Sequence, residues 1–181
     1  AHLRTHPDAV LAGLETIATT SAQFVREVCK TGAAGIFLAV QHASYRLLTR
    51  EEYERFGAPF DQQVLDALSG AAWFNVLHLH GLDVMFDLLA DYPVQAINWH
   101  DRETRPTLAE AMSGTSRALI GGLRQWETVV RGTPADVHAE VSDAIQQTGG
   151  RRLIVGTGCV TPIVAPMGNL RAARAAVDNQ A

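Results

Sequence analysis

The sequence predicts an α/β fold of the β/α-barrel type, and three observations support this. Five short apolar runs alternate with helical patterns, as expected of parallel strands joined by helices. The turn at Gly156 and Gly158 continues into Cys-Val-Thr-Pro, so it lacks the phosphate-binding pattern of a doubly wound nucleotide fold. A complete TIM-type barrel needs about 250 residues. We therefore expect residues 1–181 to be one domain, the C-terminal five βα units of such a barrel, whose N-terminal strands are absent from this chain.

The first half of the chain predicts two helical regions and two strands. Residues 7–29 carry apolar side chains at a spacing near 3.6 residues and are expected to form a helix that ends at Lys30-Thr-Gly32. The nearly continuous apolar run 33–40 is typical of a strand buried on both faces. Thr49-Arg-Glu-Glu52 has the form of a capping box and begins a helix that continues to residue 68, with a break near Pro59. A second strand is expected at 74–79.

The second half continues the alternation. A short helix is expected at 83–90, a strand at 94–99, a helix at 108–112 and a strand at 118–121. Thr133 as a cap and Pro134 at the first helical position begin a helix that runs to residue 147 and ends at Gly149-Gly150. The fifth strand is expected at 152–155 and a last helix at 167–177. Such an incomplete barrel would leave two open sheet edges and an exposed inner face.

The composition excludes several classes of protein. With 47% hydrophobic and 19% charged residues, the chain is expected to be globular, and its net charge of -4 gives no basic surface for nucleic acid. No run of about 20 apolar residues and no signal peptide are visible, so we expect no membrane association and a cytoplasmic location. Cys29 and Cys159 lie on different kinds of element, so a disulfide is not expected and Cys159 is free to bind a metal.

The pair His78 and His80 is the strongest functional signal. Residues two apart on a strand share a face and lie roughly 6.5 Å apart at Cα, so both rings can reach one metal ion. Cys159, near the end of the fifth predicted strand, would be a third ligand. Two imidazoles and a thiolate suit zinc with one position open to substrate. The alternative is an accidental pair, because the chain has seven histidines and histidine is often an ordinary, partly buried residue.

Other polar residues gather where the predicted strands end. In a β/α barrel this rim holds the active site, although loops are polar wherever they occur. We expect Gln41, His42, Asn98 and Trp99 to bind the substrate, with Trp99 as an aromatic wall unless it belongs to the core. Asp101 or His100 would orient a metal-bound histidine through its second nitrogen, unless each is a solvated loop residue.

Several motifs resemble the uroporphyrinogen decarboxylase superfamily. They are Gly132-Thr-Pro-Ala-Asp-Val137, Gly149-Gly-Arg-Arg-Leu-Ile-Val-Gly-Thr-Gly-Cys159, Pro162-x-x-x-Pro166-x-x-Asn-Leu170, and Leu47-Leu-Thr-Arg-Glu-Glu-Tyr-Glu-Arg-Phe56 with Pro59. Their order and spacing cover the chain from about residue 7 to residue 177. The resemblance implies strands four to eight of a β/α barrel with its active site at the C-terminal mouth.

The resemblance is closer to one branch of the superfamily. The decarboxylase has a Ser and a His where this chain has Gln41 and Cys159. Zinc-dependent methyltransferases carry a His-x-Cys and a later Cys, which His78, His80 and Cys159 match with one histidine in place of a cysteine. This branch implies zinc, catalytic roles for Cys159 and His78, a corrinoid as methyl donor, a thiol acceptor and a corrinoid protein as partner.

Two other functions stay open at this point. The first is metal-free decarboxylation of tetrapyrrole carboxylates, which needs no cofactor. The second is a noncatalytic barrel remnant that binds a partner protein. The chain is also expected to form a homo-oligomer or to pair with an N-terminal half, since that half would carry the Asp and Arg residues that the decarboxylase resemblance implies.

Overall fold

The strands form one parallel sheet in which they pair in chain order. The computed structural model describes residues 2–68, 70 and 72–178. The strands are β1 (Phe37–Val40), β2 (Val76–Leu79), β3 (Ala96–Trp99), β4 (Ala118–Leu123) and β5 (Leu153–Thr157), in the order β1-β2-β3-β4-β5. The order never reverses, so the sheet is wound in one direction, as in a β/α barrel and unlike a doubly wound fold. The predicted fold class is confirmed.

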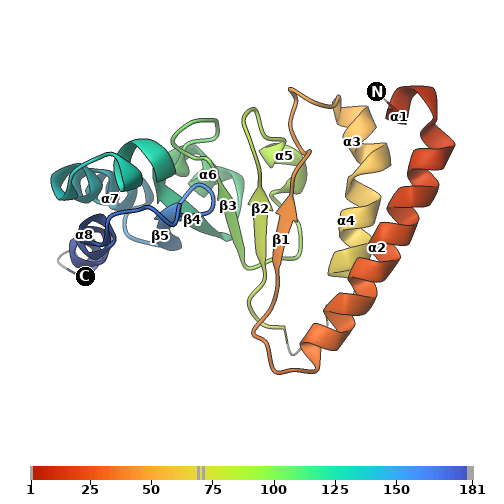
Figure 1. Cartoon of the computed structure of the whole chain (residues 1–181), viewed down its shortest axis with the longest axis horizontal. Coiled ribbons are helices and arrows are strands. Elements are labelled where there is room, and N and C mark those ends of the chain that lie inside the picture. Colours follow the sequence, from red (N-terminus) through yellow and green to blue (C-terminus); the bar gives the residue numbers. More distant parts are fainter. Residues whose placement is uncertain (1, 69, 71, 179–181) are drawn as a thin grey trace.

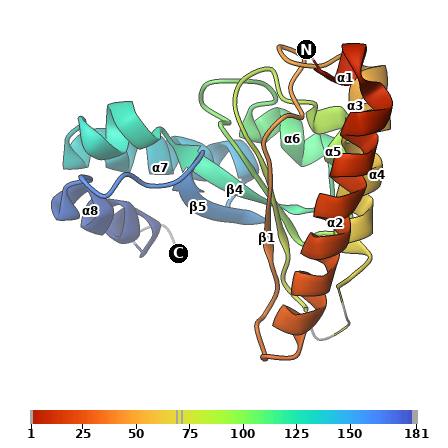
Figure 2. The same ribbon diagram turned by 45° about the vertical axis from the view of Figure 1, so that its right-hand side comes forward.

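The helices pack against one face of this sheet, the outer face, and leave the inner face uncovered (Figures 1 and 2). Helices α5 and α6 lie behind β2 and β3 in Figure 1, α7 and α8 lie at the β5 end, and α2 with α4 lies beside β1. None of the described helices is long and apolar enough to cross a membrane. The helices are α1 (His2–Thr5), α2 (Pro7–Cys29), α3 (Arg50–Phe56), α4 (Ala58–Leu65), α5 (Phe86–Leu89), α6 (Leu108–Gly114), the π-helix η1 (Gln125–Val130), α7 (Pro134–Thr148) and α8 (Met167–Asp178).

The predicted helix boundaries are confirmed at the capped ends. Thr49 and Thr133 both form capping boxes, in which each threonine side chain accepts a hydrogen bond from the backbone of the residue three positions later. Gly149 ends α7 in the left-handed conformation, with φ of 62°. The break predicted near Pro59 lies at Gly57, between α3 and α4. The short α1 and the π-helix η1 had no signal in the sequence.

The strands are shorter at their beginnings than the apolar runs predict. The run 33–40 forms a strand only from Phe37 onward, and the run 74–79 only from Val76. The side chain of Asn75 explains part of this difference, because its Oδ1 accepts the Ile36 N–H at 3.1 Å where a backbone carbonyl would otherwise bind. The amino ends of β1 and β2 are therefore joined by a side chain as well as by backbone.

The two faces of the sheet differ in character. Leu77, Leu79, Ile97 and Trp99 point toward the helices and belong to the main hydrophobic core. His78, one position away on β2, lies on the opposite, inner face because side chains alternate along a strand. Leu77 is 0% exposed, so the apolar outer face fixes which residues face inward.

The five strands do not close into a ring, and apolar side chains are exposed at both edges. Phe37 on β1 is 59% exposed and Ile154 on β5 is 42% exposed. Phe37 also stacks on the ring of His78, with the centroids 5.5 Å apart. The described strands therefore form an open sheet with two unpaired edges.

A partly buried carboxyl group links the helices on the β1 side. Asp61 on α4 accepts hydrogen bonds from the hydroxyl groups of Tyr53 on α3 and of Tyr92, the latter at 3.2 Å. Burial raises the pKa of Asp61 from 3.8 to about 6, although both hydrogen bonds act in the opposite direction. The folded state therefore holds the Asp61 proton more tightly than the unfolded state does.

Asp61→Asn is expected to change how stability depends on pH. The contribution of Asp61 favours folding at about pH 4 and is lost as the pH rises through about 6, whereas Asn cannot titrate. We compare the free energy of unfolding of the variant with that of the wild type by urea denaturation. As the pH rises from about 4 to 7, this difference should change by about 2 to 3 kcal/mol in favour of the variant. The exposed Asp66→Asn is the control. A difference that does not vary with pH would contradict this assignment.

Candidate metal centre

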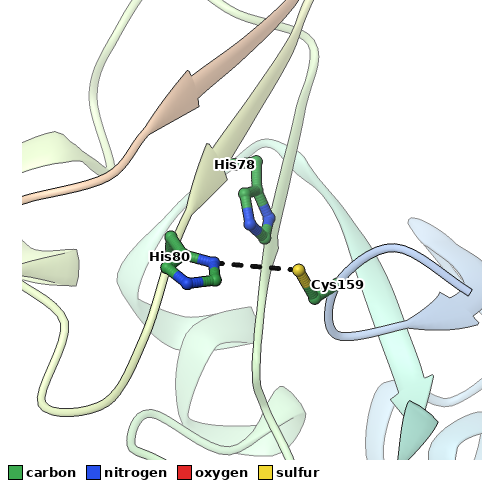
Figure 3. A group of neighbouring side chains, drawn as sticks. All are labelled: His78, His80 and Cys159. Atoms are coloured by element: carbon green, nitrogen blue, oxygen red, sulfur yellow. Dashed lines mark hydrogen bonds between the residues drawn. The ribbon is translucent and has the colours of Figure 1, made fainter. Parts of the chain in front are cut away.

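His78, His80 and Cys159 come together at the carboxyl ends of the strands, although Cys159 is 79 residues from His80 in the sequence. His78 is the third residue of β2 and His80 follows that strand, whereas Cys159 lies on the loop after β5. One ligand atom from each residue lies within 4.8 Å of the other two. Figure 3 shows the imidazole of His80 directed toward the Cys159 sulfur, with Nδ1 and Sγ 3.7 Å apart.

These three side chains fit a zinc ion. Zinc binds histidine nitrogen at about 2.0–2.1 Å and cysteine sulfur at about 2.3 Å, almost always in tetrahedral geometry. Two such bonds at a tetrahedral angle place the ligand atoms about 3.6 Å apart. The 3.7 Å between His80 Nδ1 and Cys159 Sγ agrees with this edge. A zinc ion held by three ligands would keep one position open for a substrate.

His78 is held by a neighbour on the next strand. It is 3% exposed, and its Nδ1 lies 2.6 Å from Oδ1 of Asn98 on β3, which is its partner in the strand register. Burial lowers the pKa of His78; the contact with Asn98 raises it, and the nearby His80 and His100 lower it again. The net effect favours neutral imidazole, which is the form that binds metal.

His100 lies beside the same cluster. Its ring centroid is 5.6 Å from that of His80 and 6.3 Å from that of His78. Burial lowers its pKa, while Glu103, whose carboxylate lies 3.6 Å from Nδ1, raises it. Its Nε2 is buried and has no hydrogen-bond partner among the described residues. His100 therefore presents an unpaired nitrogen next to the three candidate ligands.

Asn98, and neither His100 nor Asp101, makes the hydrogen bond to a histidine nitrogen that was expected of those two residues. Asp101 is buried, and both of its carboxylate oxygens accept the Gly122 N–H at 3.1 Å. Burial raises the pKa of Asp101 to about 6, against the effect of this hydrogen bond. Asp101 therefore fixes the end of β4 and does not contact the histidine rings with any hydrogen bond of the described residues.

The expected substrate-binding residues lie in different places. Trp99 is 0% exposed, packs against Phe86 with centroids 4.8 Å apart and donates from Nε1 to the Pro106 carbonyl at 2.8 Å. It belongs to the outer core, so the structure contradicts the expectation of an aromatic pocket wall. The alternation of side chains along β3 excludes Trp99 and Asn98 from the same face.

Gln41 and His42 both lie exposed at the mouth. Gln41 lines a small cavity of about 180 Å³ beside His80, whereas His42 is not among its lining residues. The cavity is also lined by Ser44, Arg46, Leu47, Gly81 and Leu82. Gln41 is therefore exposed and shares this cavity with His80, which is one of the candidate ligands.

Gly158 permits the loop after β5 to approach β3. A Cβ atom at this position would lie 2.7 Å from the His100 Cα and 3.0 Å from the Trp99 carbonyl oxygen. Both are backbone atoms, which cannot move aside as a flexible side chain can. The missing side chain of Gly158 therefore sets how closely Cys159, the next residue, approaches the histidines.

The sequence matches one protein family over almost its whole length. The family model of uroporphyrinogen decarboxylase (URO-D) matches residues 1–180. The chain belongs to this family. The resemblance recognised in its motifs is thereby confirmed, and the family accounts for the β/α-barrel architecture.

The similar proteins favour the methyltransferase branch of the family. "Methylcobamide:CoM methyltransferase MtbA" of Methanosarcina mazei is 29% identical over 171 residues, which are 94% of this chain and 49% of that protein. The protein of the same name from Methanosarcina acetivorans is 27% identical over 176 residues, with the same shares covered. The chain thus spans about half the length of the curated relatives it matches.

A solved structure confirms the fold. A methyltransferase from Methanosarcina mazei superposes with a TM-score of 0.82 at 19% sequence identity, over 97% of this chain and 51% of the other. At this identity the likeness concerns the fold alone. It places the described strands in a barrel-type architecture.

Gly158→Ala is expected to move the Cys159 loop away from the histidines. Because the new methyl group would meet backbone atoms, the free energy of unfolding should fall by about 1 to 3 kcal/mol, and any zinc binding should weaken. Chemical denaturation and competition with a chromogenic zinc chelator measure these effects. Gly168→Ala, at an exposed helix position with nothing within 4 Å of the new Cβ, is the control. Equal effects of both variants would contradict the packing argument.

Proposed function

We propose that this chain forms the zinc-binding part of a methyltransferase active site, which transfers a methyl group from a corrinoid to a thiol. The observation that carries the proposal is the convergence of His78, His80 and Cys159 at the carboxyl ends of β2 and β5. These are ligand types that zinc prefers, at a spacing that suits it. The similarity to methylcobamide:CoM methyltransferases supports the reaction class.

Some residues of the chain would bind zinc, and others would exclude water from the substrate thiol. A bound zinc ion would lower the pKa of a substrate thiol and keep the substrate as a thiolate near neutral pH. His78 would bind zinc through Nε2 and His80 through Nδ1, both as neutral imidazoles, and Cys159 would supply the negative charge. Leu47 and Leu82 give the small cavity beside His80 an apolar wall, which would limit the access of water to the thiol.

The substrate and partner follow from the same proposal. We expect a thiol small enough to enter the cavity next to His80 and Gln41, and a corrinoid, carried by a partner protein, to approach the uncovered inner face. In the proposed reaction the thiol would lose its proton, its sulfur would bond to the methyl carbon, and the corrinoid would leave with the electron pair of its former bond to that carbon. The whole site would include residues beyond the described five strands, because the relatives are about twice as long.

Zinc binding tests the proposal directly. The purified protein is expected to hold about one zinc ion per chain, measured by atomic emission spectroscopy, since three ligands converge on one point. Cys159→Ser should abolish stoichiometric zinc. The matched control is Cys29→Ser, because Cys29 lies on α2 away from the cluster, and this variant should keep the metal.

Activity separates the proposal from its alternatives. Demethylation of methylcobalamin by a thiol should require Cys159 and His78. A metal-free protein that releases CO₂ from uroporphyrinogen would be a decarboxylase, and that outcome would overturn the proposal. Zinc binding without either reaction would indicate a noncatalytic barrel remnant and would also refute it.

A further inference from the structure

We propose that Asn98 is a positioning residue that fixes the tautomer and the ring orientation of His78. This inference rests on the proposed metal centre and assigns to Asn98 a role different from the expected contact with substrate. The side chain is 4% exposed and lies behind His78 on the neighbouring strand. All of its polar atoms have partners within the protein.

The orientation of the Asn98 amide is determined by two carbonyl groups. Its Nδ2 donates to the Ile120 carbonyl of β4 at 2.8 Å and to the Thr157 carbonyl of β5 at 3.1 Å. A reversed amide would place Oδ1 against two acceptors and would lose both hydrogen bonds in a buried place. Leaving buried polar groups unpaired costs about 1 to 3 kcal/mol each, so the reversed orientation is excluded.

This orientation decides which nitrogen of His78 carries the proton. The Oδ1 atom of Asn98 can only accept a hydrogen bond, and it lies 2.6 Å from Nδ1 of His78. Nδ1 must therefore carry hydrogen and donate it. In neutral imidazole the lone pair is then on Nε2, which is the form needed for Nε2 to bind a metal. Free histidine prefers the opposite tautomer, so Asn98 selects the less common one.

Asn98 also connects His78 to the strand that carries the third ligand. Through its amide, β3 is joined to the last residue of β5, Thr157. The hydroxyl of Thr157 in turn donates to the carbonyl oxygen of Cys159. One side chain therefore links the ring of His78 on β2 to the loop that positions the cysteine. Ligands held in this way on packed strands need little rearrangement to bind a metal.

The tautomer of His78 can be read in the metal-free protein. Long-range ¹H–¹⁵N NMR at about pH 8, where an ordinary imidazole is neutral, distinguishes the two ring nitrogens. We expect hydrogen on Nδ1 in the wild type and a shift toward hydrogen on Nε2 in Asn98→Ala. Zinc affinity, measured by competition with a chromogenic chelator, should fall about 10- to 100-fold in this variant.

Asn75→Ala is the matched control. Asn75 is also buried, at 3%, and also joins strands, but it lies at the opposite end of β2. Its substitution should lower stability while leaving the His78 tautomer unchanged and the zinc affinity within about threefold. An unchanged tautomer in Asn98→Ala would overturn the proposal. Equal losses of zinc affinity in both variants would do the same, because they would indicate a purely structural role.

A second variant covers the case in which Asn98→Ala does not fold. Asn98→Asp keeps an oxygen next to His78 but loses the donors to Ile120 and Thr157, so the Nδ1–H tautomer should persist while stability falls. Loss of this tautomer would contradict the proposal. If the wild type binds no zinc, the proposed function fails, whereas the tautomer measurement still decides the role of Asn98.

Discussion

The candidate metal centre depends on the parallel pairing of the strands in chain order. In a parallel sheet the carboxyl ends of all strands share one edge, which is why His80 and Cys159 meet although 79 residues separate them. The register is fixed by apolar packing on the outer face, since a slip of one residue would bury His78 among the helices and expose Leu77. The hydrophobic core therefore determines the geometry of the polar site.

The hydrogen bonds on the inner face distinguish residues whose polar atoms are all paired within the protein from residues with a polar atom that could bind a ligand. Asn98 and Asp101 are buried with partners on their polar atoms, so their role is to hold backbone and rings in place. In contrast, Nε2 of His100 is buried and has no hydrogen-bond partner in the part of the chain that the structure describes, which is costly unless a ligand or water occupies the space in front of it. Unpaired buried polar atoms are rare. The position of this nitrogen beside the three candidate ligands therefore supports the interpretation of the cluster as a ligand-binding site.

Much of the fold could be predicted from the sequence, because capping boxes and apolar runs are local signals. The convergence of His78, His80 and Cys159 could also be predicted from the sequence, since parallel strands place their carboxyl ends together. The π-helix η1 had no such signal. The role of Asn98 depends on carbonyl groups of β4 and β5, which become its neighbours only when the sheet forms. The place of Trp99 in the core is one of the two alternatives that the sequence left open, and side-chain alternation favours it, because adjacent residues on a strand cannot line the same pocket.

The histidine at position 80 changes the electrostatics of the proposed metal centre. The resemblance implies a cysteine there, and Nδ1 is the ring nitrogen nearer the backbone, two bonds from Cβ, so it is the histidine atom best placed to replace a sulfur. The contact of His80 with Cys159 is made by this nitrogen. Replacing a thiolate by neutral imidazole leaves a bound zinc ion one unit more positive. A substrate thiol would then ionise more readily, but its sulfur would be a weaker nucleophile, because nucleophilicity falls with pKa. Under the proposed function, the exchange would favour a thiol that is intrinsically basic, since such a thiol can lose some electron density and still attack a methyl group.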